Sequence, residues 1–584
     1  MTTRDIGFLK WKDPSAWMET MRGPRWKARC AAENRRFSKA VEDAGGADAA
    51  PFKAADAEII WDLGDVKVYQ RRGIEWAWKG SSKKVRAGDL DLVAGCLVYS
   101  EEVGGGAERY AIRAVTPEGE LWSKEGEHGF GPYVAIMERV YVLEATGPLQ
   151  YSRLVSFNLE GKDKRVHYEE QDPSNALRLV RGENACLFLI SENAGRQTLY
   201  HVGKSFKCLG EGVFHPVGFA PNSDEPCYFY REKKGWKARG AALESFPPFG
   251  ACGIDLVLLN GLRAYRIHGK RHLYFKNRLV KTFFGEIDAN PWAIWRGRAV
   301  DIVCGVERRK GIIDSKGCRI GPPTIHYSYK DGMAKSKDGS GVRWIVAHKG
   351  APKGVIICGY GAYGTPTHID LMRWKPFLDN GVAIGFALVR GGGDHTEEWA
   401  EAGRVQGKLR GVEDFEACIR AIQDVMNLGA RRTCAFGRSA GGYLVGAAVV
   451  RNPDGGLFGS AYTEVPYVDV LRTASNPRLP LTKYEYLEFG DPAHNIADFE
   501  TMLRLSPVDG LGRDGAPGVF VLCRTGINDR QVYAYESVKW MDALGGGEDK
   551  ILAINGGQGH FTVGDSLYRE RADDYAILMK RILG

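Results

Sequence analysis

The hydrophobic pattern changes once along this chain, and that change constrains the fold more than any other feature. Between about residues 58 and 335, short apolar or alternating runs recur between polar and glycine-rich turns, without helical periodicity. Further on, short apolar runs alternate with helix-like stretches such as 412–427 and 534–544. The first pattern is typical of an all-β sandwich, barrel or propeller, and the second of a mostly parallel sheet covered by helices on both faces.

The length of 584 residues supports a division into domains, because single hydrophobic cores stop growing at about 250–300 residues. We predict a helical leader over residues 1–57, a β-propeller over 58–335 and an α/β domain over 336–584, with the leader packed on the α/β domain. At roughly 40 residues for a four-stranded blade, the β segment would hold six or seven blades. No repeated blade signature is visible, so the residues alone leave the number open.

Charge and composition exclude several classes of protein. The formal net charge is +8, from 80 Lys and Arg residues and 72 Asp and Glu residues that are mixed along the chain. The sequence lacks the concentrated basic stripe that nucleic-acid binding requires. No segment has the pattern of a secretory signal or a membrane span, so we expect a soluble cytoplasmic protein. The 12 cysteines include no Cys-x-x-Cys pair and are expected to be reduced core residues. No metal or cofactor is predicted.

A glycine-flanked serine follows one predicted strand of the α/β segment. Residues 433–436 form an apolar run, Gly437-Arg438-Ser439-Ala440-Gly441-Gly442 comes next, and residues 443–450 are predicted to be helical. Glycines permit the tight turn that lifts a nucleophilic serine above a sheet. The amides at the start of the following helix suit a developing oxyanion. Ser439 is therefore the predicted nucleophile.

A nucleophilic serine needs a base and a carboxylate, which in α/β-hydrolases follow it in the order acid, then histidine. Only His494 and His560 follow Ser439, and His494 precedes the apolar run 519–523 that should carry the acid. His560 lies in a glycine-rich loop after the last predicted strand, and Asp529 lies beyond the run 519–523. The predicted triad is Ser439, Asp529 and His560.

Several motifs in fixed order resemble those of the prolyl oligopeptidase family, and the Gly-Arg-Ser-Ala-Gly-Gly form resembles its oligopeptidase B branch. The resemblance extends from about residue 355 to the C-terminus. It rests on Gly359-Tyr360-Gly361-Ala362-Tyr363-Gly364, Arg390-Gly391-Gly392-Gly393, Ala402-Gly403-Arg404, the serine motif, Val465-Pro466-Tyr467-Val468-Asp469-Val470 and Gly559-His560-Phe561.

The resemblance implies an α/β-hydrolase domain capped by a seven-bladed β-propeller that admits only short peptides. It also implies an oxyanion hole formed by the Ala440 amide and the Tyr360 hydroxyl, which is chemically reasonable because two donors can meet the charge of a tetrahedral intermediate. Further substrate contacts are expected from Tyr363 and Tyr467.

Glu485 falls where oligopeptidase B has a glutamate in the S1 pocket, the pocket for the residue before the scissile bond (P1). A buried carboxylate there would pair with a P1 arginine or lysine. The second S1 glutamate of that branch falls on Leu487. An arginine two residues after the catalytic aspartate anchors substrate in prolyl oligopeptidase, whereas Gln531 holds that position here and Arg530 precedes it. We therefore expect weaker anchoring of the peptide backbone.

These observations favour a serine oligopeptidase, monomeric or homodimeric, that cuts short peptides after basic residues. Two alternatives remain open. One keeps the triad but acts on esters, thioesters or a modified or cyclic peptide. The other is a propeller-based binding protein with weak hydrolase activity, against which the complete predicted triad argues.

Overall fold

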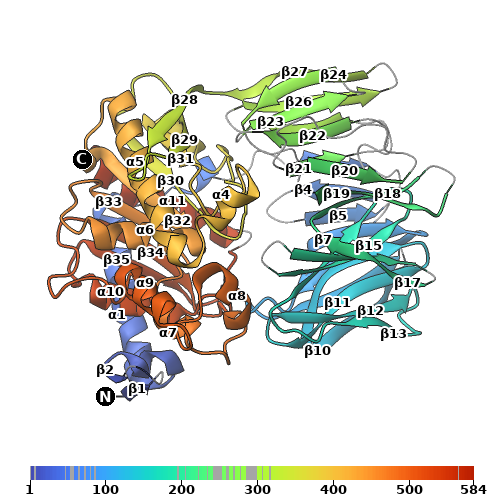
Figure 1. Ribbon diagram of the computed structural model, residues 1–584, viewed down its shortest axis with the longest axis horizontal. Helices are drawn as coiled ribbons and strands as arrows, with labels where there is room; N and C mark the ends of the chain where they lie inside the picture. The colour runs from blue at the N-terminus through green and yellow to red at the C-terminus, as the bar shows by residue number, and fades with distance from the viewer. Residues whose placement is uncertain are drawn as a thin grey trace.

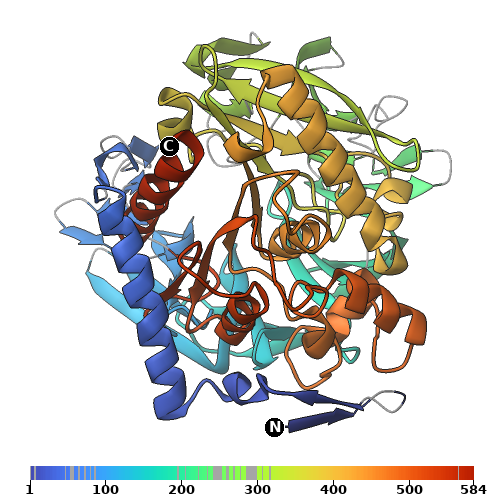
Figure 2. The same cartoon turned by 90° about the vertical axis from the view of Figure 1, so that its left-hand side faces the viewer.

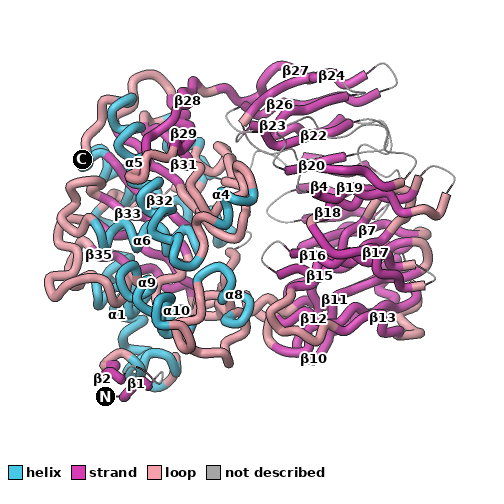
Figure 3. Tube along the Cα trace, viewed as in Figure 1, coloured by secondary structure: helices cyan, strands magenta, loops and turns pink. Residues whose placement is uncertain are grey.

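The protein consists of an all-β region and an α/β domain that lie side by side (Figure 1). This computed structural model describes residues 2–584 except 6–7, 9, 47, 53–57, 63–65, 71–73, 79–80, 85–86, 117, 194–195, 204, 221–222, 233–234, 241–252, 258–261, 268–269, 276–277, 285–298, 305–306, 315–316 and 563–564. Helices are confined to the α/β domain and the N-terminal segment within these residues (Figure 3). The two textures of the sequence therefore correspond to two structural regions.

Residues 58–326, called the β domain below, form separate antiparallel sheets. Four-stranded sheets cover residues 58–84, 176–212 and 253–283, and three-stranded sheets cover 214–239 and 299–326. The largest sheet has seven strands in consecutive order: β7 (Ala87–Val93), β8 (Cys96–Glu102), β9 (Tyr110–Thr116), β10 (Gly119–Ile136), β11 (Arg139–Gly147), β12 (Gln150–Asn158) and β13 (Arg165–Glu169).

Strand β10 is long enough to belong to two groups of strands. Its first part, Gly119 to Glu125, pairs with β9, and its last part, Tyr133 to Ile136, pairs with β11. The registers shift between these parts. A β-bulge of this kind bends a strand and increases its twist. The seven-stranded sheet is thus two groups of four strands that share one continuous strand.

The α/β domain contains an eight-stranded sheet in the order β28-β29-β31-β30-β32-β33-β34-β35. The pairs β28–β29 and β29–β31 are antiparallel, and the remaining pairs are parallel. The strands are β28 (Ser328–Lys335), β29 (Gly341–His348), β30 (Gly354–Cys358), β31 (Val382–Ala387), β32 (Thr433–Arg438), β33 (Ser460–Glu464), β34 (Phe520–Gly526) and β35 (Lys550–Asn555). The sheet starts at β28, inside the segment that we expected to belong to the β domain. The sequence pattern placed the boundary too late because the hairpin β28–β29 has the same alternation of apolar and polar residues as the β domain.

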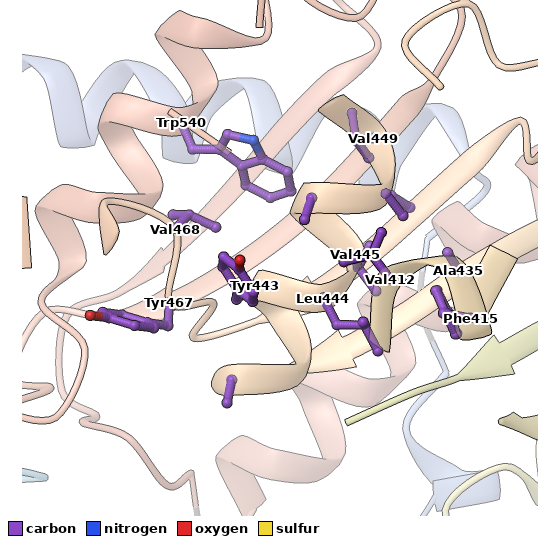
Figure 4. Packing of buried hydrophobic residues seen from close by; sticks show 14 of the residues in the cluster. Val412, Phe415, Ala435, Tyr443, Leu444, Val445, Val449, Tyr467, Val468 and Trp540 are labelled. Atoms are coloured by element: carbon purple, nitrogen blue, oxygen red, sulfur yellow. The ribbon is translucent and has the colours of Figure 1, made fainter. Parts of the chain in front are cut away.

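Helices cover both faces of this sheet. One core contains α5 (Lys408–Met426), α6 (Ala440–Arg451) and α10 (Ala534–Ala543), and the other contains α3 (Lys375–Asp379) and α11 (Asp565–Leu583). Figure 4 shows Trp540 and Val468 beside Tyr443 of α6, the helix that follows the predicted nucleophile. The smaller helices are α4 (Glu397–Glu401), α7 (Val470–Ala474), α8 (Thr482–Phe489) and α9 (Ile496–Leu505).

The N-terminal segment packs on the α/β domain at the open edge of its sheet. After the hairpin β1 (Thr2–Asp5) and β2 (Lys10–Asp13), helix α1 (Gly23–Asp43) runs beside α11 (Figure 2). The Asn34 side-chain amide bonds both the carbonyl oxygen of Ile554 in β35, at 2.9 Å, and its amide nitrogen, at 2.8 Å. A polar side chain thus satisfies backbone groups of the edge strand that would otherwise be free to pair with another chain.

A buried ion cluster joins this segment to helix α10 and to the start of helix α7. The Lys539 ammonium lies 2.7 Å from an oxygen of Asp469 and 2.5 Å from one of Glu19. Arg472 bonds Asp469 as well, and also Asp13 of β2 at 2.9 Å. Lys539 and Asp469 are fully buried. Each charge in the cluster therefore depends on its partners for compensation.

We expect Lys539→Met to lower the free energy of unfolding of the α/β domain by about 3–5 kcal/mol, because it leaves Asp469 with one buried cation fewer. Chemical denaturation followed by tryptophan fluorescence measures the loss. Lys10→Met is the matched control, since Lys10 pairs with Asp5 at the surface, where water screens the pair, and the substitution should leave stability nearly unchanged. Equal stability of the two variants would contradict this account of the cluster.

Candidate active site

Ser439 lies at a sharp turn between β32 and α6, with φ +54° and ψ −121°. A positive φ is strained for a residue with a Cβ and is typical of nucleophile elbows. The neighbouring glycines make the turn possible: a Cβ on Gly437 would lie 2.0 Å from the Gly441 oxygen, and one on Gly442 would lie 2.4 Å from Pro466. The predicted strand, turn and helix around Ser439 are thus all present.

Asp529 and His560 meet beyond the carboxyl ends of β34 and β35. Asp529 Oδ2 lies 2.8 Å from His560 Nδ1, and both side chains are buried. The other oxygen of Asp529 accepts from the amides of Gln531 at 2.8 Å and Val532 at 2.9 Å. A carboxylate held in this way fixes the imidazole with Nδ1 protonated, which leaves Nε2 as the proton acceptor.

The elbow and the histidine loop are in direct contact. The Arg438 guanidinium, next to Ser439 in the chain, donates to the backbone oxygen of His560. The Arg438 guanidinium also lies over the Phe561 ring, 4.8 Å from its centre. Among the hydrogen bonds of the described side chains, none joins Ser439 to His560. Catalytic hydrogen bonds are often long or poorly aligned in enzymes without bound substrate, so this geometry does not argue against the pair.

The two predicted oxyanion donors flank the nucleophile. Ala440 is the first residue of α6, so its amide has no acceptor within the helix and is available to an oxyanion. Tyr360 follows β30 and lines the same cavity as Ser439. Burial raises the pKa of Tyr360 above its usual value, which keeps the phenol protonated and able to donate.

A hairpin of the β domain packs against the triad loops. Residues 103–109, between β8 and β9, are held by Glu102, whose oxygens accept from the amides of Gly104 and Gly106. A Cβ on Gly106 would lie 2.3 Å from the Gly559 nitrogen, one residue before His560. The backbone oxygen of Gly105 accepts from Asn528, one residue before Asp529, at 2.7 Å. The β domain thus touches both loops that carry the predicted acid and base.

Glu108 of this hairpin engages the residue that we expected to replace an anchoring arginine. The Gln531 amide donates to both carboxylate oxygens of Glu108, at 2.9 and 2.8 Å. Burial raises the pKa of Glu108. Gln531 also lines the cavity next to Ser439, whereas Arg530 is not among the described residues that line it. The amide that could bind a substrate carbonyl is therefore already bound to the β domain.

A cavity of about 670 Å³ lies between the two domains and contains Ser439. Its α/β-domain wall includes Tyr360, Tyr363, Tyr467 and Glu485. Its β-domain wall includes residues 149–152 and 170–173. A volume of this size is in the range of sites that bind small molecules. Tyr363, Tyr467 and Glu485, all predicted to contact substrate, thus lie in one cavity with the predicted nucleophile.

Glu485 is buried in this cavity beneath a group of aromatic rings. Its two oxygens accept from the Tyr363 hydroxyl, at 3.0 and 2.8 Å. Tyr363 stacks on Tyr484, with ring centres 6.5 Å apart. Burial raises the pKa of Glu485 to about 8, opposed by the Tyr363 hydrogen bond and assisted by the charge of Glu488. Glu485 is therefore mostly protonated at neutral pH when the cavity is empty.

A second carboxylate lies beside Glu485, but not at the position that the resemblance implied. Leu487 is 44% exposed on helix α8, whereas Glu488 is buried. Glu488 is paired with Lys408, and Arg404 lies 3.2 Å from its other oxygen. Two cations thus neutralise Glu488, so it does not offer a free negative charge to a substrate.

Sequence reasoning missed the β-domain hairpin and Glu488. The run Gly104-Gly105-Gly106 was the available signal for a close backbone contact, although glycines in a hairpin are ordinary. The spacing of Glu485 and Glu488 was the signal for the second residue, since positions three apart share a helix face. In the described part of the chain, no cluster of His, Cys, Asp and Glu could hold a metal, and no helix is long and apolar enough to cross a membrane.

Comparisons with known proteins find a family match within the α/β domain. Residues 368–584 match the prolyl oligopeptidase family. Over 238 residues, 40% of this chain, the sequence is 33% identical to Protease 2 of Moraxella lacunata, and over 221 residues, 36% of this chain, it is 34% identical to prolyl endopeptidase-like of Macaca fascicularis. The aligned segments span only 34% and 29% of these relatives.

The whole fold also resembles a solved structure. Oligopeptidase B from Trypanosoma brucei with covalently bound antipain, in a closed form, superposes with a TM-score of 0.81. The match covers 98% of this chain and 95% of that one, at 18% sequence identity. The likeness establishes the shared fold of both domains.

The contact of Gly106 with the histidine loop generates a test. We expect Gly106→Ala to lower kcat by about 100-fold on any substrate, because a misplacement of about 1 Å in a catalytic group costs that much. Gly95→Ala is the matched control: Gly95 also has a positive φ, +77° against +96°, but no atom lies within 4 Å of the place that its Cβ would take. Steady-state kinetics, with circular dichroism to verify folding, decide the matter. Similar kcat values for the two variants would show that the hairpin does not position His560.

Proposed function

We propose that this chain, whose residues 368–584 form a domain of the prolyl oligopeptidase family, is a serine oligopeptidase that hydrolyses short peptides, preferentially after arginine or lysine. The observation that carries the proposal is Glu485, a buried carboxyl group in the same cavity as Ser439. A buried carboxylate selects a cationic side chain, because each charge compensates the other out of water.

In the proposed reaction, Ser439 Oγ attacks the scissile carbonyl carbon while His560 Nε2 takes its proton. The Ala440 amide and the Tyr360 hydroxyl stabilise the resulting oxyanion. His560 then returns the proton to the departing amine, and water, activated by the same imidazole, hydrolyses the acyl-enzyme. Asp529 stabilises the imidazolium in both steps through the 2.8 Å contact.

The proposal includes a seven-bladed propeller that limits substrate size. Dividing β10 between its two groups of strands turns the six sheets of residues 58–326 into seven units. The proposed site is walled by both domains, so a short extended peptide could occupy it while a folded protein could not. A cytoplasmic location also belongs to the proposal, supported by the free thiols of the described cysteines.

One observation favours a second candidate, an esterase or thioesterase with the same nucleophile. The side-chain amide of Gln531 donates to Glu108. It is therefore not available as a hydrogen-bond donor to the backbone of a bound peptide. Small activated esters do not need that donor. A comparison of kcat/KM for matched arginyl amide and ester substrates distinguishes the two activities.

The nucleophile is tested by Ser439→Ala. We expect hydrolysis of peptides and esters to fall by about 10⁴-fold or more, because members of a triad act as a unit. Ser439→Ala should also abolish labelling by a fluorophosphonate. His560→Ala should lower both the hydrolysis rate and the labelling nearly as far. Appreciable turnover by purified Ser439→Ala would overturn the assignment, and an unlabelled wild-type protein would favour a binding function instead.

The pKa of Glu485 predicts a pH-dependent specificity. Below about pH 8 the carboxyl group is mostly neutral, and above it mostly charged. Since Arg and Lys side chains keep their charge to above pH 10, the ratio of kcat/KM for P1 arginine to that for a neutral P1 residue should rise by about tenfold from pH 7 to pH 9.

Using this ratio cancels pH effects on the catalytic steps that both substrates share. In Glu485→Gln the ratio should be low and independent of pH, and the loss should fall mainly on basic substrates. A ratio that is flat in the wild type, or unchanged by the substitution, would show that Glu485 does not face the P1 side chain.

A further inference from the structure

A second cavity, of about 120 Å³, borders the His560 loop on the α/β domain. It is lined by the ends of β32, β33 and β34, by residues 559–562 and by helix α11. Ser439 and Glu485 line the larger cavity and do not line this one. His560 lines it, but the proposed hydrolysis places no part of the substrate there.

Four guanidinium groups and two carboxyl groups line this second cavity. Two of the guanidinium groups are paired with carboxylates. Arg373 forms a two-point ion pair with Glu464, and Arg524 lies 2.6 Å from Asp574. The charges of these two arginines are thus compensated within the protein.

The other two, Arg438 and Arg571, have no carboxylate within ion-pair distance among the side chains that the structure describes. The Arg438 guanidinium donates to the backbone oxygen of His560 and lies over the Phe561 ring, and Glu464 attracts it without a direct ion pair. Burial and the like charge of Arg373 lower the pKa of Arg571, and the more distant charges of Glu464 and Asp370 offset this only in part. A half-buried cation in this position destabilises the empty cavity, and an anion would relieve that cost.

The remaining polar groups are consistent with an anionic occupant. The Glu570 carboxyl bonds Asn555, and burial raises the pKa of Glu570, so its negative charge is disfavoured. The Thr525 hydroxyl is buried, with 3% of the residue exposed, and has no hydrogen-bond partner among the described groups. A buried hydroxyl without a partner usually indicates a missing water or ligand.

The size of the cavity limits what it can hold. At about 120 Å³, it has room for a few water molecules, or for one group such as phosphate or carboxylate. A guanidinium group binds either anion through two parallel hydrogen bonds. A larger ligand would have to leave most of its atoms outside.

We propose that this cavity is a binding site for one small oxyanion, held by Arg571 and Arg438 with the Thr525 hydroxyl as a further donor. Because Arg438 also bonds the backbone of His560, the occupant is coupled to the loop that carries the proposed base. Binding at this site should therefore change the rate of hydrolysis without competing with small substrates for the larger cavity.

The direct test uses inorganic phosphate and the purified full-length protein. Calorimetric titration at constant ionic strength, balanced with sodium chloride, should give one site for each chain, and phosphate should raise the melting temperature. Arg571→Gln should weaken binding at least tenfold and Arg571→Lys less. Arg569→Gln, an exposed arginine on the same helix, should leave binding unchanged.

Two sources of the oxyanion are distinguished with peptides and Ser439→Ala protein. If the occupant is the terminal carboxylate of a bound peptide, peptide acids should bind more tightly than peptide amides, and phosphate should compete with the acids. If it is a free anion, acids and amides should bind alike while phosphate still binds. No phosphate or acid-dependent binding in the wild type, or undiminished binding in well-folded Arg571→Gln, would overturn the proposal whether or not the protein is a peptidase.

Discussion

The carboxyl edge of one parallel sheet is the constraint on which the rest of this structure depends. Parallel strands all end at the same edge, so residues separated by more than a hundred positions in the chain can meet there. Ser439 follows β32, Asp529 follows β34 and His560 follows β35. The buried cores on both faces and the N-terminal helix at the outer strand keep this edge in place.

Electrostatic compensation decides what the main cavity can recognise. Two carboxyl groups on one face of α8 would repel each other in a buried site, and the protein resolves this by giving one of them two cations. The other, Glu485, keeps only neutral hydroxyl contact from Tyr363 in the empty cavity. Its charge therefore develops only when a cation approaches or the pH rises, which is the basis of the proposed preference for a cationic substrate.

Local patterns predicted much of this arrangement. Strand, glycine turn and helix around Ser439 are adjacent in the chain, and the order of acid and histidine follows from the order of the parallel strands. Leu487 was assigned by position in a motif, whereas helical periodicity places Glu488 beside Glu485. The contact of Gly106 with Gly559 joins residues about 450 positions apart, and a single sequence holds no signal for such a pairing. The hairpin β28–β29 has the texture of the β domain, so the boundary between domains lies earlier than the pattern indicated.

The hairpin that carries Gly106 and Glu108 couples the proposed peptidase activity to the contact between the two domains. Its contacts with Asn528, Gln531 and Gly559 exist only while the two domains are together. Any separation wide enough to admit a substrate would break them and remove the support of the acid and base loops. In the proposed peptidase, admission and cleavage would then be mutually exclusive, so the enzyme would cut only peptides that it has already enclosed.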